Sequence, residues 1–315
     1  MIKEHGSALL ITLMILALMA ALAAEMTISF QTQLQRSRRV NDHIQAKYTL
    51  FYAEERATSS LLQQLQAKEG VHTPFPSDES EIMDNQACYN LNVLTTLPTE
   101  ALITPSYDVL VFMALLEKLG IEKHAATVIT QSLADNIDAD TQPRWQGAED
   151  EYYQQKGKQQ LTANQFLFLT SEIRSLRGGS PSLYRNLSPY VCAQFSSQLM
   201  VNINSLTDKQ APLLSALFLN EIDDDDARSL LRKRPQAGWE TIDAFIYQAQ
   251  KDHSATKPLV DTLKKYLTTR SQYYLIATSF REGEFTSGMR TFLFYDEKNQ
   301  QLRVYMRQLT AGGGN

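Results

Sequence analysis

Hydrophobic and polar residues follow a different pattern in the first 66 residues than in the rest of the chain. Residues 8–24 are uncharged and almost entirely apolar, and Gly6 and Ser7 extend the uncharged run toward the N-terminus. A helix over this run spans about 28 Å, which is close to the hydrocarbon thickness of a bilayer. The pattern therefore predicts a membrane-spanning helix over residues 7–24 or slightly beyond.

The same helix is predicted to continue far past the apolar run. No glycine or proline occurs between Ser7 and Glu69, and the stretch is rich in good helix formers such as Leu, Ala, Gln, Glu and Arg. We expect one helix from residue 7 to about 66, about 90 Å long, whose second half is amphipathic and packs on a globular domain. The apolar positions at helical spacing are Ile44, Tyr48, Phe51, Tyr52, Leu61, Leu62 and Leu65.

Three interpretations of the N-terminus compete. A secretory signal peptide would be cut near the Ala-Leu-Ala of residues 21–23. A plain signal anchor agrees with Lys3 on the inner side, but the positive-inside rule is opposed by four basic residues beyond the membrane, Arg36, Arg38, Arg39 and Lys47. A prepilin-type leader would be cut between Gly6 and Ser7. The long helix favours the third interpretation, because an ordinary signal peptide has no reason to run on into such a helix.

The remainder of the chain predicts a helical region followed by a sheet. A segment rich in glycine and proline, residues 70–76, ends the long helix, and the polar residues 77–92 are compatible with short strands. Residues 273–280, 289–295 and 302–308 are rich in Tyr, Phe, Val, Ile and Thr, which predicts an antiparallel meander. Apolar spacing predicts helices over residues 106–119, 125–137, 164–176, 182–190, 207–219, 224–233, 239–250 and 258–267.

The predicted fold class is α+β, with a pilin-like long N-terminal helix packed on a small antiparallel sheet and interrupted by a large all-α inserted domain. The leader is assigned to residues 1–6 and the long helix to residues 7–70. Residues 71–99 and 268–310 form the pilin-like α/β domain, and residues 100–267 form the all-α insertion.

Charge and cysteine content narrow the functional classes. The net charge of −5 leaves no electrostatic footprint for a phosphate backbone, so we expect no nucleic-acid partner. Cys88 and Cys192 form no CxxC pair and make no zinc site by spacing. They are either two buried thiols or one disulfide, and the prediction of export favours the disulfide.

An acidic stretch is the best candidate for a metal site. A loop dense in carboxylates can supply the several oxygen ligands that calcium prefers. It is not an EF-hand, because Gln142 and Pro143 stand where the next acid and the required glycine would be. The alternatives are a solvated loop, or pairing of acids with Arg144. The candidate ligands are Asp135, Asp138, Asp140, Glu149 and Asp150, with Glu151 beside them.

No catalytic constellation is present in the sequence. HExxH, GxSxG, Walker A and GxGxxG motifs are all missing, so we expect a protein that is not an enzyme. The four acids of residues 223–226 precede an apolar segment that closes with basic residues, which is typical of charges that complement a helix dipole. A DNA-gripping helix-hairpin-helix is disfavoured because the surroundings of residues 164–267 are acidic.

Several blocks in order resemble one known family, the minor pseudopilin K of the type II (general) secretion pathway. The leader KEHG at residues 3–6 followed by SALL at residues 7–10 is similar to its short leader. Ile11 stands at the fifth mature position, where most pilins carry glutamate. The lack of that glutamate is a mark of the K subunit. Further similar blocks are DNQACYNLN at residues 84–92, LADNIDAD at 133–140, GAEDEYY at 147–153, SEIR at 171–174, RGG at 177–179 and NIN at 202–204.

The resemblance implies a role and a location. It implies a single-pass protein of the bacterial inner membrane with its globular part in the periplasm, processed by a prepilin peptidase and N-methylated at Ser7. It implies a cap at the tip of the pseudopilus together with the minor pseudopilins I and J, and contact with other pseudopilins. It also implies calcium binding. The competing hypotheses are a signal-anchored periplasmic binding or adhesion protein unrelated to secretion, and a secreted hydrolase that uses Asp138 and Asp140.

Overall fold

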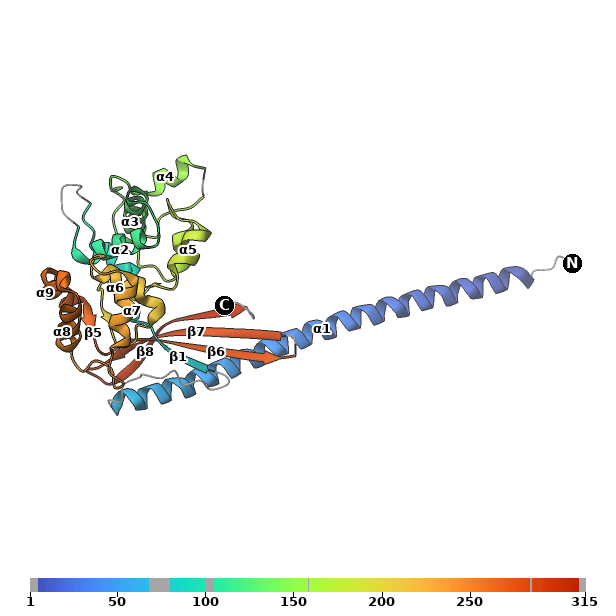
Figure 1. The fold of residues 1–315 in the computed structure, drawn as a ribbon. Helices are drawn as coiled ribbons and strands as arrows, with labels where there is room; N and C mark the ends of the chain where they lie inside the picture. Colours follow the sequence, from blue (N-terminus) through green and yellow to red (C-terminus); the bar gives the residue numbers. More distant parts are fainter. Residues whose placement is uncertain (1–4, 68–79, 100–104, 158, 284, 312–315) are drawn as a thin grey trace.

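A computed structural model describes residues 5–67, 80–99, 105–157, 159–283 and 285–311. Helix α1 runs from His5 to Gln66 as one uninterrupted element of 62 residues, which confirms the predicted rod. Its first half projects from the rest of the molecule (Figure 1). Most of the leader (residues 1–4) and the predicted helix end at residues 70–76 lie outside the described residues.

The C-terminal part of the chain forms the predicted sheet. Strands β6 (Tyr273–Glu282), β7 (Phe285–Asp296) and β8 (Gln301–Ala311) make an antiparallel meander. Strand β1 (Ser80–Asp84) joins its edge beside β6, also antiparallel, so that the strand order is β1-β6-β7-β8. The meander is therefore confirmed, and the short strand expected within residues 77–92 completes the sheet.

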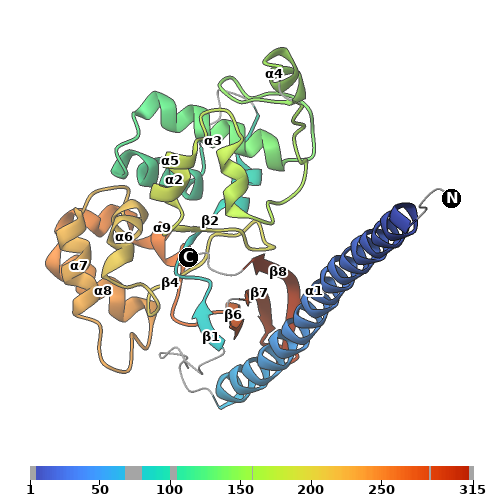
Figure 2. The same ribbon diagram turned by 90° about the vertical axis from the view of Figure 1, so that its right-hand side faces the viewer.

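Helix α1 packs its second half on one face of this sheet. Small residues let the helix backbone approach the strands closely, and they recur three or four positions apart on a single face. The facing strand residues include Ile82, Tyr274, Ile276 and Leu293. The inserted helices gather on the side of the sheet away from α1 (Figures 1 and 2). The buried helix positions are Ala46, Leu50, Ala53, Ala57 and Leu61.

One ion pair fixes the helix to the sheet at a buried point. Glu54 lies on the covered face of α1 and its side chain is only 7% exposed. The Arg307 guanidinium on β8 donates to both Glu54 oxygens, with Nε 2.9 Å from Oε2 and Nη2 2.8 Å from Oε1. The hydrogen bonds to Glu54 raise the pKa of Arg307. Because one partner is removed from water, loss of the other would leave a buried charge unpaired.

The inserted region is a cluster of short helices with four very short strands. Two parallel two-residue pairs, β2 (Tyr89–Asn90) with β3 (Val191–Cys192) and β4 (Val201–Asn202) with β5 (Leu267–Thr268), connect its segments. The α-helices are α2 (Tyr107–Lys118), α3 (Lys123–Ile137), α4 (Asp150–Gln155), α5 (Pro181–Leu187), α6 (Ala211–Leu217), α7 (Asp224–Arg232), α8 (Ile242–Asp252) and α9 (Val260–Leu263). The 3-10 turns are η1 (Leu91–Thr96), η2 (Thr170–Arg174), η3 (Asp208–Gln210), η4 (Ser254–Leu259) and η5 (Lys264–Tyr266).

Six of the eight predicted helices are confirmed, as α2, α3, α5, α6, α7 and α8. The prediction of a helix over 164–176 is wrong, because this segment contains only the turn η2. The backbone amide of Leu167 donates to Asn92 Oδ1 at 2.8 Å, and the amide of Leu169 donates to Glu172 Oε1 at 2.8 Å. Side chains thus take the donors that a helix would need. Over 258–267 only the four residues of α9 are α-helical.

Buried residues form two separate clusters. The larger one begins at Tyr89 and ends at Leu267, and it contains residues of every α-helix of the inserted region except α4. The smaller one joins α1 to the sheet. The predicted division of the chain at residues 70, 100 and 267 stays a prediction. The larger cluster begins within residues 71–99, the range that the sequence assigned to the pilin-like part.

Candidate functional site

The first half of α1 presents apolar side chains that nothing in the structure covers. Among the described residues it is the one helix long and apolar enough to cross a membrane, and its apolar window is 0% buried. Leu10 is 70% exposed and Met14 69% exposed. Apolar surface of this extent needs a bilayer or neighbouring helices to cover it. Gly6 and Ser7 lie in the first turn of this helix. Cleavage between them and methylation of Ser7 stay predictions.

Ile11 lies on the same uncovered part of α1, and its side chain is 56% exposed. The fifth position after the predicted cleavage site is therefore apolar and faces the surroundings of the helix. A carboxylate there without a partner would cost several kcal/mol in an apolar medium. A role of Ile11 in assembly stays a prediction.

The second half of α1 carries an outward apolar face. The residues on the sheet side are buried, whereas the helix positions between them point away from the sheet. Phe51 lies near two cations, with Lys47 Nζ 5.9 Å and the Arg307 guanidinium carbon 5.7 Å from the ring centre. This outward face of α1 consists of Val40, Ile44, Tyr48, Phe51 and Tyr52, all exposed.

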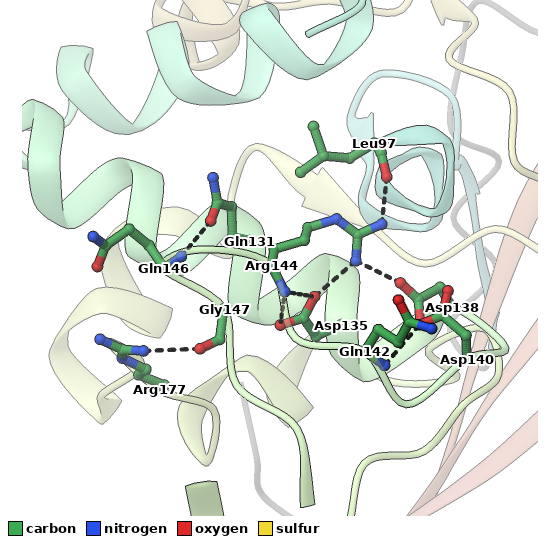
Figure 3. A network of polar contacts seen from close by, with 10 residues as sticks. All are labelled: Leu97, Gln131, Asp135, Asp138, Asp140, Gln142, Arg144, Gln146, Gly147 and Arg177. Atoms are coloured by element: carbon green, nitrogen blue, oxygen red, sulfur yellow. Dashed lines mark hydrogen bonds and ion pairs between the residues drawn. The ribbon is translucent and has the colours of Figure 1, made fainter. Parts of the chain in front are cut away.

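The acidic stretch is organised around one arginine (Figure 3). Asp135 lies in the last turn of α3 and is completely buried, and Asp138 follows the helix end. Arg144 Nη1 donates to Asp135 Oδ1 at 2.7 Å and to Asp138 Oδ2 at 2.5 Å, and Nη2 donates to the Leu97 carbonyl. The alternative that Arg144 pairs with these two acids is therefore confirmed.

The geometry around Asp135 is tight and depends on a glycine. A Cβ on residue Gly147 would lie 1.8 Å from Asp135 Oδ2, so no other residue fits there without movement. Burial raises the pKa of Asp135, although the hydrogen bonds and charge of Arg144 oppose this. Burial also disfavours the charged guanidinium of Arg144, yet hydrogen bonds to Asp138 and Asp135 raise its pKa overall. Asp135 therefore pairs with Arg144 and does not serve as a ligand for a metal ion.

Three of the five predicted ligands are brought together. Carboxylate oxygens of Asp138, Asp140 and Glu149 all lie within 4.8 Å of one another. Asp138 Oδ1 and both Glu149 oxygens are buried and have no hydrogen-bond partner among the described residues. Buried polar atoms are rarely left unpaired in proteins, so this donor set fits a hard cation with oxygen ligands. Metal binding itself stays a prediction.

Asp150 serves the local structure instead. The Thr162 amide and hydroxyl both donate to Asp150 Oδ1 at 2.7 Å, and these hydrogen bonds lower the pKa of Asp150. Glu149 precedes it at the start of α4. Burial raises the pKa of Glu149 to about 7, and the charges of Asp135, Asp138 and Asp150 act in the same direction. The single hydroxyl proton of Thr162 points to Asp150, which leaves the Glu149 oxygens without a donor.

An open pocket lies beside the acidic site. It has a volume of about 520 Å³ and its wall includes Glu149, Asp150 and Trp145. Trp145 is 81% exposed, which is unusual for tryptophan.

The two cysteines are joined in a disulfide, as predicted. Cys88 and Cys192 have their Cα atoms 5.8 Å apart and are separated by 104 positions in the chain. The bond lies beside the parallel pair of Tyr89 with Val191. Disulfides persist in oxidising compartments, which agrees with the prediction that this part of the chain is exported.

The acids at residues 223–226 have the structural role that the sequence favoured. Asp223 caps α7, because its Oδ1 accepts from the Asp226 amide at 2.8 Å. That hydrogen bond lowers the pKa of Asp223. Negative charge at a helix N-terminus is stabilising through the helix dipole.

The similarity to known proteins extends over most of the chain and is not confined to the acidic site. A family model described as "Type II secretion system (T2SS), protein K" matches residues 87–196, and a second with the same description matches residues 201–270. Together these ranges cover more than half of the chain. The chain belongs to the type II secretion system protein K family.

Relatives in the protein K family match over nearly the full length. The "Putative type II secretion system protein K" of Escherichia coli strain K12 is 42% identical, with 98% of both chains covered. The protein K of Klebsiella pneumoniae is 35% identical with 92% of both chains covered, and that of Aeromonas hydrophila is 33% identical with 98% covered. Each relative is therefore similar in the long helix, the inserted region and the sheet alike.

A solved structure shows the same fold. A chain in the crystal structure of the GspK-GspI-GspJ complex from the enterotoxigenic Escherichia coli Type 2 Secretion System aligns with a TM-score of 0.72. It is 30% identical, and the alignment covers 88% of this chain and 100% of that chain. The predicted α+β fold with a long N-terminal helix is thus confirmed. Membership of the protein K family makes this chain a minor pseudopilin, a structural component of the type II secretion system.

Sequence reasoning missed one residue that matters for the protein K fold. Glu54 was not singled out, although it is the buried acid that ties α1 to β8. A signal was present, because Glu54 follows Leu50 by four positions and precedes Ala57 by three, on the apolar face of the helix. A lone acid on such a face indicates a buried ionic partner.

Proposed function

We propose that this minor pseudopilin caps the tip of a periplasmic pseudopilus together with the minor pseudopilins I and J, and that it supports assembly for protein export without acting as an enzyme. The observation that carries the proposal is the full-length similarity to a chain of a solved complex that contains GspK, GspI and GspJ. The outward face of α1 supplies a surface for neighbouring subunits, because its exposed aromatic residues suit a protein interface. Other pseudopilins would also contact this subunit through α1.

The anchor is the apolar half of α1 in the inner membrane. A prepilin peptidase cuts between Gly6 and Ser7 and leaves the apolar segment on the mature protein, with Ser7 N-methylated. The globular part then lies in the periplasm, where the Cys88–Cys192 disulfide is stable. The membrane span is supported by the helix length and by the uncovered apolar side chains of residues 9–24.

The apolar residue at the fifth mature position fits the end of a fibre. In an interior subunit, a carboxylate at that position would meet the amino terminus of the subunit ahead. A subunit at the tip has none ahead, so a carboxylate would remain unpaired in the membrane at a cost of several kcal/mol. Ile11 avoids that cost.

Calcium binding belongs to the same proposal. Asp138, Asp140 and Glu149 would hold the ion, with Asp138 Oδ1 and the two Glu149 oxygens as the atoms that lack other partners. A bound Ca²⁺ supplies positive charge that offsets the buried carboxylates. Its role would be structural, joining the end of α3 to the start of α4.

The mature N-terminus tests the proposal most directly. Intact-mass measurement of the protein from membranes should show a chain that begins at Ser7 and carries one added methyl group. A chain that begins at Ala24 or Glu25 would show removal of the anchor and would contradict a fibre subunit. Affinity purification from the same membranes should recover the minor pseudopilins I and J.

A further inference from the structure

A groove lies between the inserted region and the face of the sheet that is turned away from α1. Its volume is about 520 Å³. Tyr274 and Leu293 pack toward α1, and because side chains alternate along a strand, their neighbours Leu275 and Phe292 face the groove. The opposite wall comes from η2, α5 and β3 of the inserted region. We call this the junction groove, and the lining residues that matter below are Phe168, Tyr184, Arg185, Leu275, Arg290 and Phe292.

The junction groove is positively charged. The charged side chains in its lining are Arg185 on α5 and Arg290 on β7, and no acid lines it among the described residues. Both arginines are exposed, and neither makes an ion pair in the part of the chain that the structure describes. The whole chain has a net charge of −5, so two unopposed cations in one groove run against its overall charge. A cleft lined by one sign of charge attracts groups of the opposite sign.

Acids on the neighbouring elements do not neutralise these arginines. Glu172 on η2 is used locally, because its Oε1 accepts the backbone amide of Leu169 at 2.8 Å. Glu81 on β1 lies in the same row of the sheet as Arg290, but β6 stands between their strands. Two strand spacings separate them by about 10 Å. The negative charge that would match Arg185 and Arg290 must therefore come from another molecule.

Aromatic side chains continue the junction groove across the sheet. The ring of Phe292 lies 6.1 Å from that of Tyr305 on β8, measured between ring centres. Tyr273 on β6 lies 6.1 Å from Tyr305 and 5.1 Å from Phe294, and all four side chains are half-buried. From β6 to β8 this surface spans about 10 Å, the length of about three residues of extended chain. A small molecule held in the groove would leave these rings uncovered, whereas an extended segment would cover them.

The junction groove is too far along α1 for membrane lipids to reach it. Arg307 on β8 binds Glu54 and pairs with Thr291, which lies between Arg290 and Phe292 on β7. Glu54 therefore marks the level of the groove along the helix. It lies about 45 Å of helical rise beyond residue 24, where the apolar run ends. This exclusion of lipid rests on the proposed function, in which α1 spans the membrane.

We propose that the junction groove binds an extended, acidic segment of a partner protein. Its carboxylates pair with Arg185 and Arg290, and its apolar side chains pack on Leu275, Phe292 and the rings beside them. Arginine matches carboxylate oxygens with paired, charge-assisted hydrogen bonds. Aromatic residues and arginine are also the residue types enriched at protein interfaces. This surface is separate from the outward face of α1, which lies on the other side of the sheet.

The test measures how the full chain in detergent binds a synthetic peptide. The probe is fluorescein-labelled Ser-Phe-Glu-Leu-Asp-Phe-Ser, and its counterpart carries Gln and Asn in place of the two acids. Fluorescence anisotropy should show roughly tenfold tighter binding of the acidic peptide at low salt and a smaller difference at high salt. Combined Arg185→Gln and Arg290→Gln substitutions should remove the difference between the two peptides.

A matched control removes the same charge outside the groove. Arg39 and Arg281 are exposed, do not line the groove and make no ion pair within the described ranges of the chain. Combined Arg39→Gln and Arg281→Gln substitutions should keep the tenfold difference between the peptides. Equal loss in the two double variants would reflect net charge alone and would overturn the inference.

Other outcomes assign the groove to a different occupant or to none. Equal affinity for the two peptides, or no binding of either, would overturn the inference. Competition by benzoate or short-chain phosphatidylglycerol as strong as that by unlabelled peptide would assign the groove to a small anion or a lipid. A dimer of the chain in sedimentation experiments that the Arg185→Gln and Arg290→Gln variant abolishes would assign it to a second copy.

Failure of this inference and failure of the proposed function give different results. If neither peptide binds while the pseudopilins I and J still co-purify, the inference fails and the proposed function stands. A mature chain that begins at Ala24 or Glu25 would contradict the proposed function, and binding of the acidic peptide would be unaffected.

Discussion

The apolar half of α1 and the inserted helical region use the same kinds of residue in opposite ways. Leu10 and Met14 on α1 are mostly exposed, whereas Leu94 and Leu115 in the inserted region are fully buried. The inserted region closes around its own core and is crosslinked by Cys88 and Cys192. The apolar half of α1 has no core of its own, so its stability depends on what surrounds it. Substitutions in the inserted region should therefore change its unfolding, and substitutions in the apolar half of α1 should change membrane association.

The largest effect should come from breaking the centre of the inserted region. Arg144→Ala leaves the buried Asp135 and the mostly buried Asp138 without their partner, and the free energy of unfolding should fall by about 3 to 5 kcal/mol. Urea unfolding of the purified protein in detergent measures this, with membrane association unchanged. The control is Arg232→Ala, which removes an exposed pair with Asp208 and should cost less than about 1 kcal/mol. Equal losses in the two variants would show that Arg144 is not a structural centre.

The reverse pattern is expected for a charge placed in α1. Leu16→Arg puts a guanidinium in the middle of the apolar segment, which costs about 2.5 to 3.5 kcal/mol at the centre of a membrane helix. The share of protein retained in membranes after an alkaline wash should fall, while urea unfolding of the inserted region stays the same. Tyr247→Arg changes an exposed residue of α8 and serves as the control. Full retention of the Leu16→Arg protein would contradict a membrane role for this segment.

Calcium should stabilise the inserted region and leave α1 unaffected. At a calcium concentration about 100-fold above the dissociation constant, the native state gains about 2.7 kcal/mol, and chelation should remove this gain. Glu149→Gln should abolish the gain, because it removes the buried charge that lacks a partner. The neighbouring Glu151→Gln changes an exposed acid and should keep the gain. Thermal unfolding with calcium, with magnesium and with chelator makes the comparison, and no shift with calcium in the unsubstituted protein would count against the site.

The smallest effect is expected on the outward face of α1. Tyr48→Ala and Tyr52→Ala together shorten two exposed aromatic side chains, and we expect weaker association with partner pseudopilins by about 1 to 2 kcal/mol. The folded state should be unchanged, because neither residue is buried. Quantitative co-purification of the pseudopilins I and J measures the loss, with Tyr247→Ala as the matched exposed tyrosine. Unchanged recovery of both partners would assign the assembly surface to another face.

The long helix and the meander could be predicted because their signals are local. The absence of glycine and proline decides α1, and the β-branched and aromatic segments decide β6, β7 and β8. The wrong helix over residues 164–176 has a distant cause. Asn92 lies 75 positions from Leu167, yet it bonds both the amide and the carbonyl of that residue. No local pattern records such a contact.

The acidic site shows the same limit in a smaller space. Residue types and spacing identified five acids, but they could not tell which oxygens already had partners. Arg144 donates a hydrogen bond to Asp135, and the Thr162 hydroxyl donates one to Asp150. Among the five acids, the buried oxygens without a partner therefore belong to Asp138 and Glu149. This sorting depends on how the loop after α3 turns back, which only the folded chain determines.

The unbroken course of α1 has a mechanical consequence. A rod without a hinge passes a load along its axis from its membrane end to its last buried turn. The strands of the sheet receive that load through the buried alanines and leucines of α1 and through Glu54. The force then acts parallel to the contact between helix and sheet, as a shear force. A subunit pulled or pushed at its apolar end would therefore move the sheet together with the helix.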